Sequence, residues 1–358
     1  MTFSMVLETF ASLTLQVTLL IGVAAWMVRK QHMSGASDWC WAVLHICILA
    51  LTSAAAFVPH LRLIIWADFQ PSTIHPIADA VCSVAGRICG WTWLSGALAT
   101  IALCIGGICR ETACVRRAVT DEQSEHLLHQ AVPALTTANR PIEIRFSQDS
   151  VSPFCWQFHH PVIVLPDIVR DFPVTEQAAI VRHELAHLIL QHPLHLFLQR
   201  LVEAIYWFHP LVWWASRQSA AAREFRCDRE AVNSRPEVAD YLRCLLRLIE
   251  SQVSAPGHLP AVLGFIGDAP LMARRADLLV ESLNHSKKPI GAWRSAIVLI
   301  LAGILCSLSW LPLNPSASRR ADWSPWPSWS AHALDAVGVA VRDFEVDAHR
   351  LKPHEHLR

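Results

Sequence analysis

Four long apolar runs constrain the fold of this 358-residue chain more than any other feature of its sequence. They lie at residues 10–28, 39–58, 88–109 and 295–311, and none contains a charged residue. A helix needs about 20 apolar residues to cross the hydrocarbon core of a bilayer. Charged residues make up only 17% of the chain, against about 25% in a soluble domain. The sequence therefore predicts a mainly α membrane protein with four transmembrane helices.

The basic residues that flank these runs predict their orientation. Arg29 and Lys30 follow the first run and no positive charge precedes it, which argues against a cleaved signal peptide. Lysine and arginine are enriched on the cytoplasmic side of a membrane. Eight of the flanking basic residues lie at the ends that this rule places inside (29, 30, 110, 116, 117, 287, 288, 294) and four at the outer ends (62, 87, 319, 320). The bias predicts that both termini lie outside.

The apolar runs also divide the chain into four parts. Residues 1–110 form a membrane domain with three transmembrane helices, 111–290 a cytoplasmic domain, 291–312 the fourth transmembrane helix and 313–358 a short, flexible external tail. The net charge is zero, so we expect no direct nucleic-acid binding. Eleven cysteines are scattered without a C-x-x-C pattern, and six of them lie in or beside apolar runs. They do not predict a disulfide framework.

A metal-binding motif lies inside the region that we expect in the cytoplasm. Residues His183 to His187 read HELAH, an H-E-x-x-H pattern within an apolar segment of helical spacing. Residues four apart project from one face of a helix, so His183 and His187 can bind one zinc ion. Glu184 lies beside that face, where it can act as the general base of a zinc peptidase. In a chain with 19 histidines, the alternative is a chance match.

The third zinc ligand should come from a later helix, because a catalytic zinc has three protein ligands and an open position. Glu224 lies in a helical segment after His187, and Asp228 follows it on the same face. We expect Glu224 to bind zinc and Asp228 to accept the ring N–H of a ligating histidine. The alternative is a solvated, charged helix face. Six other residues are excluded from the predicted site because we expect them in loops or at packing positions: His159, His160, His192, His195, His209 and Cys227.

Two strands and a helical hairpin are also predicted in this region. Residues 141–146 and 161–165 have strand-like patterns, and the prolines that bound the second favour an edge strand, to which a peptide substrate could add. Residues 194–216 are apolar and aromatic but contain charged residues. We expect a helix–turn–helix there, either on the membrane surface or packed as core. If this segment crossed the membrane once, His187 and Glu224 would lie in opposite compartments. Either the segment does not cross, or Glu224 is not the ligand.

Around these residues the chain resembles the BlaR/MecR family of regulatory membrane metallopeptidases. The resemblance rests on three spans before the domain and one after it, and on the segments PVIVLP, EQAAIVRHELAHL, YWFHPLVWW and REFRCDREAV. It covers roughly residues 5–311. It implies a cytoplasmic gluzincin-like α+β zinc-protease domain with zinc on His183, His187 and Glu224. Glu184 would be the general base and Asp228 would support a ligand.

The resemblance implies a zinc endopeptidase of the bacterial inner membrane that acts in signal transduction. Its substrate would be a cytoplasmic regulator, such as a transcriptional repressor, or the chain itself. The alternatives are a quality-control metalloprotease of the heat-shock type and a non-catalytic, zinc-containing receptor or scaffold. The Ser-x-x-Lys motif of the family's penicillin-binding sensors is absent, since none of the four lysines has a serine three residues before it. Substrate, cleavage site, stimulus and oligomeric state do not follow from the sequence.

Overall fold

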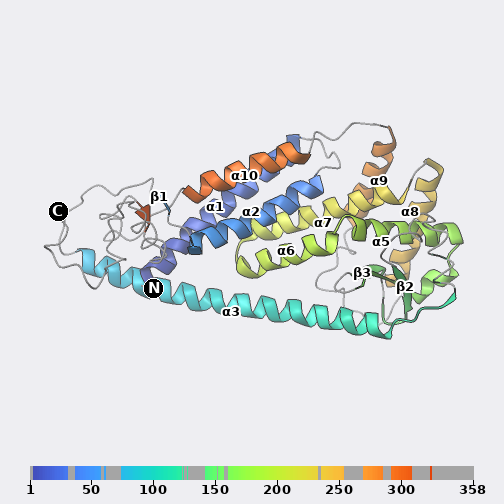
Figure 1. Cartoon of the computed structure of the whole chain (residues 1–358), viewed down its shortest axis with the longest axis horizontal. Coiled ribbons are helices and arrows are strands. Elements are labelled where there is room, and N and C mark those ends of the chain that lie inside the picture. Colours follow the sequence, from blue (N-terminus) through green and yellow to red (C-terminus); the bar gives the residue numbers. More distant parts are fainter. Residues whose placement is uncertain are drawn as a thin grey trace. The chain divides into compact units, whose positions relative to one another are not determined.

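The structure of the chain is a computed structural model that is mainly helical (Figure 1). It describes residues 3–30, 37–57, 60–61, 74–122, 124, 127, 142–150, 152–156, 160–232, 235–253, 269–284, 292–308 and 323–324. The tail at 313–358 lies mostly outside these residues, as do two elements that the sequence also predicts, an interfacial element at 61–66 and a polar helix at 120–131. Within the tail, only β5 (Trp323–Ser324) is described, and it pairs antiparallel with β1 (His60–Leu61).

Three helices are long and apolar enough to cross a membrane: α1 (Phe3–Lys30), α2 (Ser37–Phe57) and α3 (Ile74–Arg117). A fourth apolar helix, α10 (Ala292–Leu308), is shorter. Helices α1, α2 and α10 pack against one another, while α3 exposes many large apolar side chains along its length. The structure thus confirms a mostly helical protein with apolar helices of spanning character; four crossings remain a prediction.

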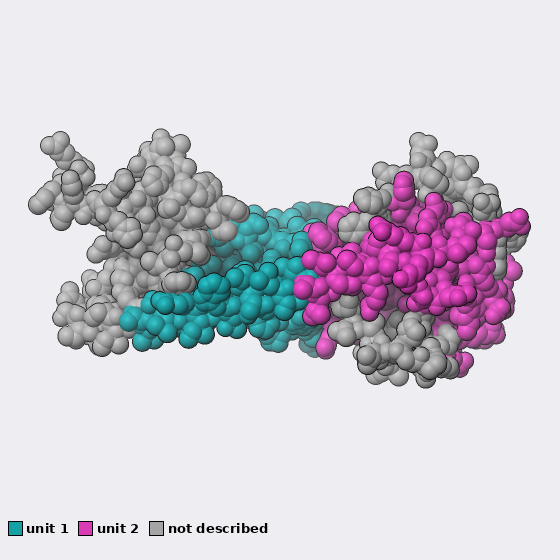
Figure 2. All heavy atoms as spheres, turned by 90° about the horizontal axis from the view of Figure 1, so that it is seen from below, with its two compact units in different colours: residues 1–101, 201–215, 290–358 teal, residues 102–200, 216–289 magenta. Residues whose placement is uncertain are grey.

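The chain forms two compact units (Figure 2). The first contains residues 1–101, 201–215 and 290–358, and the second contains residues 102–200 and 216–289. Residues 201–215 are the end of α6 (His192–Ile205), the turn after it and the start of α7 (Pro210–Ala231). The predicted helix–turn–helix is therefore present, and its turn belongs to the same unit as the apolar helices.

The turn between α6 and α7 contacts side chains along the apolar helices. The Tyr206 hydroxyl lies 2.7 Å from the hydroxyl of Thr52 on α2. His209 Nε2 lies 3.1 Å from the Thr18 hydroxyl on α1, and the Phe208 ring stacks on Phe10, with ring centroids 4.4 Å apart. Tyr206 and Phe208 thus pack against the apolar helices, whereas Trp213 and Trp214 are exposed, so a position of this group on a membrane surface stays a prediction.

Indole groups satisfy the backbone carbonyls at this turn. Trp93 on α3 donates its Nε1–H to the Ile205 carbonyl (2.7 Å), and Trp213 donates to the Trp207 carbonyl (2.7 Å). Trp207 in turn donates to the Trp93 carbonyl (3.2 Å). At membrane depth, non-helical backbone is tolerated where its polar groups are buried and bonded within the protein. The indole bonds satisfy two carbonyls of the described turn, those of Ile205 and Trp207.

The second unit contains a three-stranded sheet in the order β2-β4-β3. Strand β4 (Val162–Pro166) is central: it pairs parallel with β2 (Glu143–Ser147) and antiparallel with β3 (Phe154–Trp156). All five β4 residues are buried. The predicted edge position of this strand is therefore wrong. A proline at the first or last position of a strand leaves the ladder bonds of the residues between intact. The sequence also did not predict strand β3, which pairs with one side of β4.

Four further elements position the candidate site. They are the 3-10 helix η2 (Asp167–Asp171) and the helices α5 (Val174–Ile189), α8 (Arg235–Val253) and α9 (Ala269–Asn284). Helix α5 lies against β3, β4 and α8. Its apolar face is buried with side chains of β2, β4 and α8, among them Ile144, Leu165, Val181, Leu185 and Leu248. This packing fixes the rotation of α5 and so the direction in which its polar residues point.

Candidate metal centre

Two imidazoles of α5 meet one helical turn apart. His183 and His187 are buried or nearly so, and their Nε2 atoms are 3.3 Å apart. Two nitrogens bound tetrahedrally to one zinc ion at about 2.0–2.1 Å would be about 3.3 Å apart. The backbone of α5 thus holds the pair at the separation that a shared cation requires.

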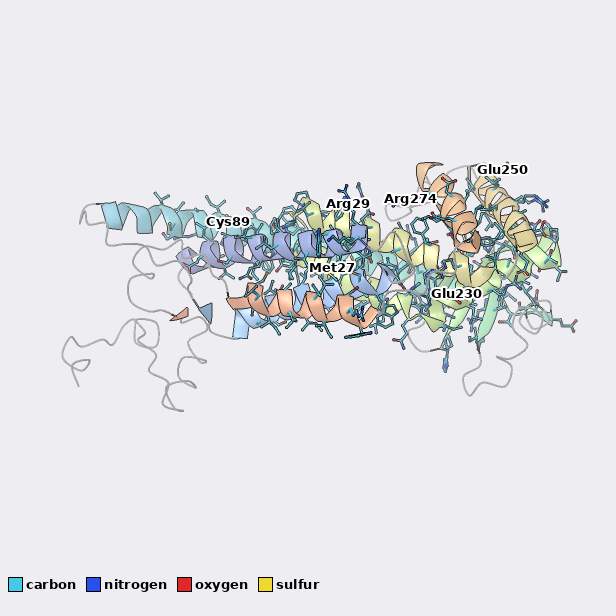
Figure 3. All side chains as sticks on the ribbon, turned by 90° about the horizontal axis from the view of Figure 1, so that it is seen from above. Met27, Arg29, Cys89, Glu230, Glu250 and Arg274 are labelled. Carbon is cyan, nitrogen blue, oxygen red and sulfur yellow. The ribbon has the colours of Figure 1, made fainter. Side chains whose placement is uncertain are left out.

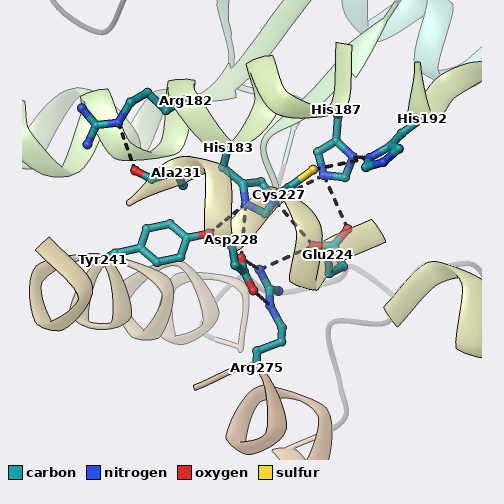
Figure 4. A network of polar contacts seen from close by, with 10 residues as sticks. All are labelled: Arg182, His183, His187, His192, Glu224, Cys227, Asp228, Ala231, Tyr241 and Arg275. Atoms are coloured by element: carbon teal, nitrogen blue, oxygen red, sulfur yellow. Dashed lines mark hydrogen bonds and ion pairs between the residues drawn. The ribbon is translucent and has the colours of Figure 1, made fainter. Parts of the chain in front are cut away.

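Helix α7 brings a carboxylate to the same point (Figure 4). Glu224 Oε2 lies 3.5 Å from His183 Nε2, and Glu224 Oε1 lies 3.6 Å from His187 Nε2. One possible ligand atom from each of the three residues lies within 4.8 Å of those of the other two. Two imidazole nitrogens, one carboxylate and the tetrahedral spacing fit a zinc ion better than Mg²⁺ or Ca²⁺, which prefer oxygen ligands.

The other nitrogen of His183 faces a buried polar pair. Asp228 Oδ1 lies 3.3 Å and the Tyr241 hydroxyl 2.8 Å from His183 Nδ1. Tyr241 donates to Asp228 (2.6 Å), so the carboxylate accepts from the hydroxyl and can also accept the Nδ1–H of His183. Such a partner fixes the tautomer that leaves Nε2 free for a metal. The structure therefore places Asp228 beside the histidine, as the sequence predicts, and adds Tyr241.

Arg275 of α9 contacts both carboxylates of this network, Asp228 and Glu224. Its guanidinium donates two bonds to Asp228, at 2.8 and 2.6 Å, and lies 3.5 Å from Glu224. Both partners of the Asp228 pair are buried. Removing one partner of a buried ion pair costs about 3–5 kcal/mol because it leaves the other charge unpaired. Arg275 thus ties α9 to the residues that surround the metal ligands.

The carboxylates and Arg275 shift the pKa values of the ligands in opposite directions. Burial lowers the pKa of His183, but the bonds to Asp228 and Glu224 outweigh it and raise this pKa to about 10. Burial raises the pKa of Glu224, yet the bond to His183 and the charge of Arg275 hold it well below its ordinary value. Glu224 is therefore an anion at neutral pH and attracts either a proton on His183 or a metal cation.

Glu184 has a different environment although it neighbours His183 in sequence. It is buried, and burial together with the charge of Glu224 raises its pKa to about 7. A carboxylate with this pKa can accept a proton near neutral pH and release it again, as general acid–base catalysis requires. Burial and the nearby cationic groups lower the pKa of His187 to about 3, so this imidazole is neutral.

A second group of possible ligands adjoins His187. Nδ1 of His187 lies 2.9 Å from Nδ1 of His192, and Sγ of Cys227 lies 3.4 Å from the same His192 atom. One ligand atom from each of these three residues also falls within 4.8 Å of the other two. His192 and Cys227, which the sequence prediction excluded from the site as packing residues, are buried and contact each other beside His187. Both contact the metal-binding region, whereas His209 lies in the other unit.

Sequence reasoning did not name Tyr241 and Arg275, and it excluded His192 and Cys227 from the site. Tyr241 and Arg275 are single polar residues of later helices, and nothing in their spacing points back to α5. His192 and Cys227 did carry a signal, because each lies within five residues of a predicted ligand. The missing information was the break between α5 and α6, where Gln191 adopts a left-handed backbone conformation (φ 55°) and turns His192 toward His187.

Comparison with known proteins identifies the class to which this fold and site belong. Residues 9–265 match the family described as BlaR1 peptidase M56. The match covers more than half of the chain, so the chain belongs to this family of membrane metallopeptidases, and the resemblance inferred from its sequence motifs is confirmed.

One relative is the regulatory protein BlaR1 of Bacillus licheniformis. It is 32% identical to this chain over an alignment of 94 residues, which covers 24% of this chain and 16% of that protein. Because the aligned stretch spans such a small part of the relative, the activity, substrate and partners of the whole relative do not transfer with it.

Proposed function

We propose that this protein is a membrane zinc endopeptidase in which His183, His187 and Glu224 bind the metal. The observation that carries the proposal is the meeting of these three side chains, from two helices, at distances that fit one tetrahedral ion. When bound there, zinc would act as a Lewis acid on a scissile carbonyl and would activate water. The family supports a metallopeptidase, and the two imidazoles and carboxylate support zinc.

The residues around the ligands would move and hold protons. The Glu184 carboxylate accepts a proton from the attacking water and passes it to the leaving amide nitrogen, for which a pKa of about 7 is suited. Asp228 and Tyr241 hold the His183 ring through Nδ1. Arg275 keeps Asp228 ionised, because its charge lowers the pKa of that carboxyl against the effect of burial.

Strand β3 would hold the substrate. It pairs with β4 on one side and packs against α5, which carries the motif. Cys155 in β3 is close enough to Glu184 and Glu224 for their charges to act on its thiol. A peptide that adds to the free side of an edge strand in extended form uses backbone bonds for affinity. Added to β3, it would run past the candidate general base.

The substrate is proposed to be a cytoplasmic regulator, such as a transcriptional repressor, in a signalling pathway of the bacterial inner membrane. This proposal rests on the family and on the relative, which is described as a regulatory protein. The cytoplasmic position of the peptidase domain and the outer position of both termini rest on the distribution of basic residues. Arg29 at the end of α1, seen in Figure 3, is one of those charges.

The Glu184→Ala variant tests the enzymatic proposal. Purified protein in detergent should cleave proteins from a cytoplasmic extract, and the variant should retain zinc but lose at least about 100-fold in rate, the contribution of a general base. Glu230→Ala, a change of an exposed glutamate on α7, serves as the matched control. Cleavage profiles that are identical for Glu184→Ala and the unchanged protein would refute the peptidase proposal.

A further inference from the structure

The side chains of His187, His192 and Cys227 lie next to one another beside the first group of ligands (Figure 4), and one possible ligand atom of each lies within 4.8 Å of those of the other two. His187 presents Nε2 to His183 and Glu224 and Nδ1 to His192. The thiol of Cys227 approaches the same His192 nitrogen. His192 and Cys227 are buried, with 3% and 0% of their surface exposed. Three soft or borderline donor atoms therefore lie close together, two of them on buried side chains.

Hydrogen bonding alone does not satisfy this arrangement. When His187 uses Nε2 as a ligand, its Nδ1 carries the proton and is a donor. The thiol is also a donor, and His192 Nδ1 offers one in-plane lone pair to both. Only one of the two donors can use it well. A cation at the centre would instead accept an electron pair from each of the three atoms.

The distances suit such a cation. Two nitrogens on a tetrahedral zinc ion are about 3.3 Å apart, and a nitrogen and a sulfur about 3.6 Å apart, given bond lengths of about 2.05 and 2.3 Å. The corresponding separations are 2.9 Å for the two imidazole nitrogens and 3.4 Å for sulfur and His192 Nδ1. An expansion of a few tenths of an ångström would admit the ion.

The surrounding charge also favours a cation. Three carboxylates, Glu224, Glu184 and Asp228, act electrostatically on the Cys227 thiol. Their negative charge opposes a bare thiolate, and it attracts a divalent ion that would neutralise the thiolate. Thiolate and imidazole ligands together select ions such as Zn²⁺, Cd²⁺ or Co²⁺ over Mg²⁺ and Ca²⁺.

We propose that His187, His192 and Cys227 form a second metal site, for a thiophilic divalent cation, that shares the imidazole of His187 with the first site. Binding releases the thiol proton of Cys227 and the Nδ1 proton of His187 to solvent, and no oxidation or reduction takes place. With both sites filled, His187 bridges the two ions as imidazolate. The like charges of the two ions repel each other across this ring, so an excess of the cation weakens the first site. This last consequence rests on the proposed peptidase function.

Cobalt titration of the whole protein tests the second site. Purified protein in detergent is stripped of metal with a chelator and titrated with Co²⁺, while the near-ultraviolet thiolate-to-cobalt charge-transfer band is recorded. The first site has no sulfur ligand and gives no such band. We expect binding of about two ions per chain, with the band developing as the second binds. The absence of a charge-transfer band at excess Co²⁺ would overturn the proposal.

Variants assign the band to its residues. Cys227→Ser should abolish the band and reduce binding to about one ion per chain, and His192→Ala should weaken the second ion at least about tenfold. Cys155→Ser is the matched control, because this thiol also lies within electrostatic range of Glu184 and Glu224; it should keep the band. A band that survives Cys227→Ser, in protein with unchanged circular dichroism, contradicts the site.

The same variants separate this proposal from the peptidase proposal. Glu184→Ala should bind both ions although it does not cleave protein, since Glu184 is not a ligand of either site. If Glu184-dependent cleavage is observed but the band is missing, only the second site fails. If the band is present but no cleavage depends on Glu184, only the peptidase proposal fails.

Discussion

The two histidines of the metal-binding motif differ in the charges that surround them. His183 lies between the carboxylates of Asp228 and Glu224, and its pKa is raised to about 10. His187 is buried beside His192 and near Arg223, and its pKa is lowered to about 3. Without metal, His183 therefore carries a proton at neutral pH and His187 does not. A metal ion entering the site must displace the proton of His183.

Zinc binding should therefore release about one proton per ion at a pH of about 8. At this pH the His183 imidazole, with its pKa of about 10, is protonated, and Glu184, with a pKa of about 7, has already lost most of its proton. The observed affinity should rise roughly tenfold per pH unit until the pH approaches the pKa of His183. Calorimetric titration in two buffers with different enthalpies of ionisation measures the proton count. A heat of binding that does not depend on the buffer would contradict the assignment.

Sequence spacing predicted the residues that share a helix and missed those that do not. His183 and His187 are four residues apart on α5, and Glu224 and Asp228 are four apart on α7, so each pair keeps its relation in any helix. Tyr241 and Arg275 reach the same site from α8 and α9. Their approach depends on tertiary packing, which local spacing does not encode.

The central strand, β4, shows at the scale of elements that a local sequence pattern does not determine tertiary position. Pro161 and Pro166 bound the buried run at residues 162–166, and an edge position was predicted from them. The Pro161 carbonyl still accepts a bond from the Glu143 amide (3.2 Å), and Pro166 is the last residue of the pairing with β2. Val162, Ile163 and Val164 between them have amide groups and pair on both sides. A proline excludes a ladder bond only at its own nitrogen.

The packing of the α6–α7 turn depends on a glycine of α3. A Cβ atom on Gly96 would lie 2.0 Å from Cε2 of the Trp207 ring, so the indole would have to move. Such a movement would also disturb its bond to the Trp93 carbonyl. Gly96→Ala should therefore lower the free energy of unfolding by about 1–3 kcal/mol, the usual cost of overpacking. Thermal unfolding of the purified protein in one detergent measures the change.

Gly106→Ala, on the same helix, is the control for this prediction. No atom lies within 4 Å of the position that its Cβ would occupy. Alanine is a better helix former than glycine by about 1 kcal/mol, so this variant should be as stable as the unchanged protein or slightly more stable. Equal stabilities of the Gly96→Ala and Gly106→Ala variants would show that the turn does not pack against α3 as described.

At the scale of the whole molecule, one helical hairpin contributes to both compact units. Residues 201–215 belong to the unit of the apolar helices, while the candidate ligands His187 and Glu224, which precede and follow them, belong to the other. The chain thus leaves the metal centre, reaches the apolar helices and returns. A single membrane crossing by residues 194–216 would separate the two ligands, so the 3.6 Å distance between His187 and Glu224 is incompatible with such a crossing.

This requirement leads to a topology that reporter fusions can test. We expect α1 to run inward, α2 outward and α3 inward, with the peptidase unit in the cytoplasm and α10 running outward. Alkaline phosphatase, which is active only outside the cytoplasm, should be active when fused within residues 62–73 or after residue 320. Green fluorescent protein, which is fluorescent only inside, should fluoresce when fused within residues 31–36, at residue 118 or at residue 232. Opposite results at residues 118 and 232 would mean that residues 194–216 cross the membrane once, and the ligand set with Glu224 would then be excluded.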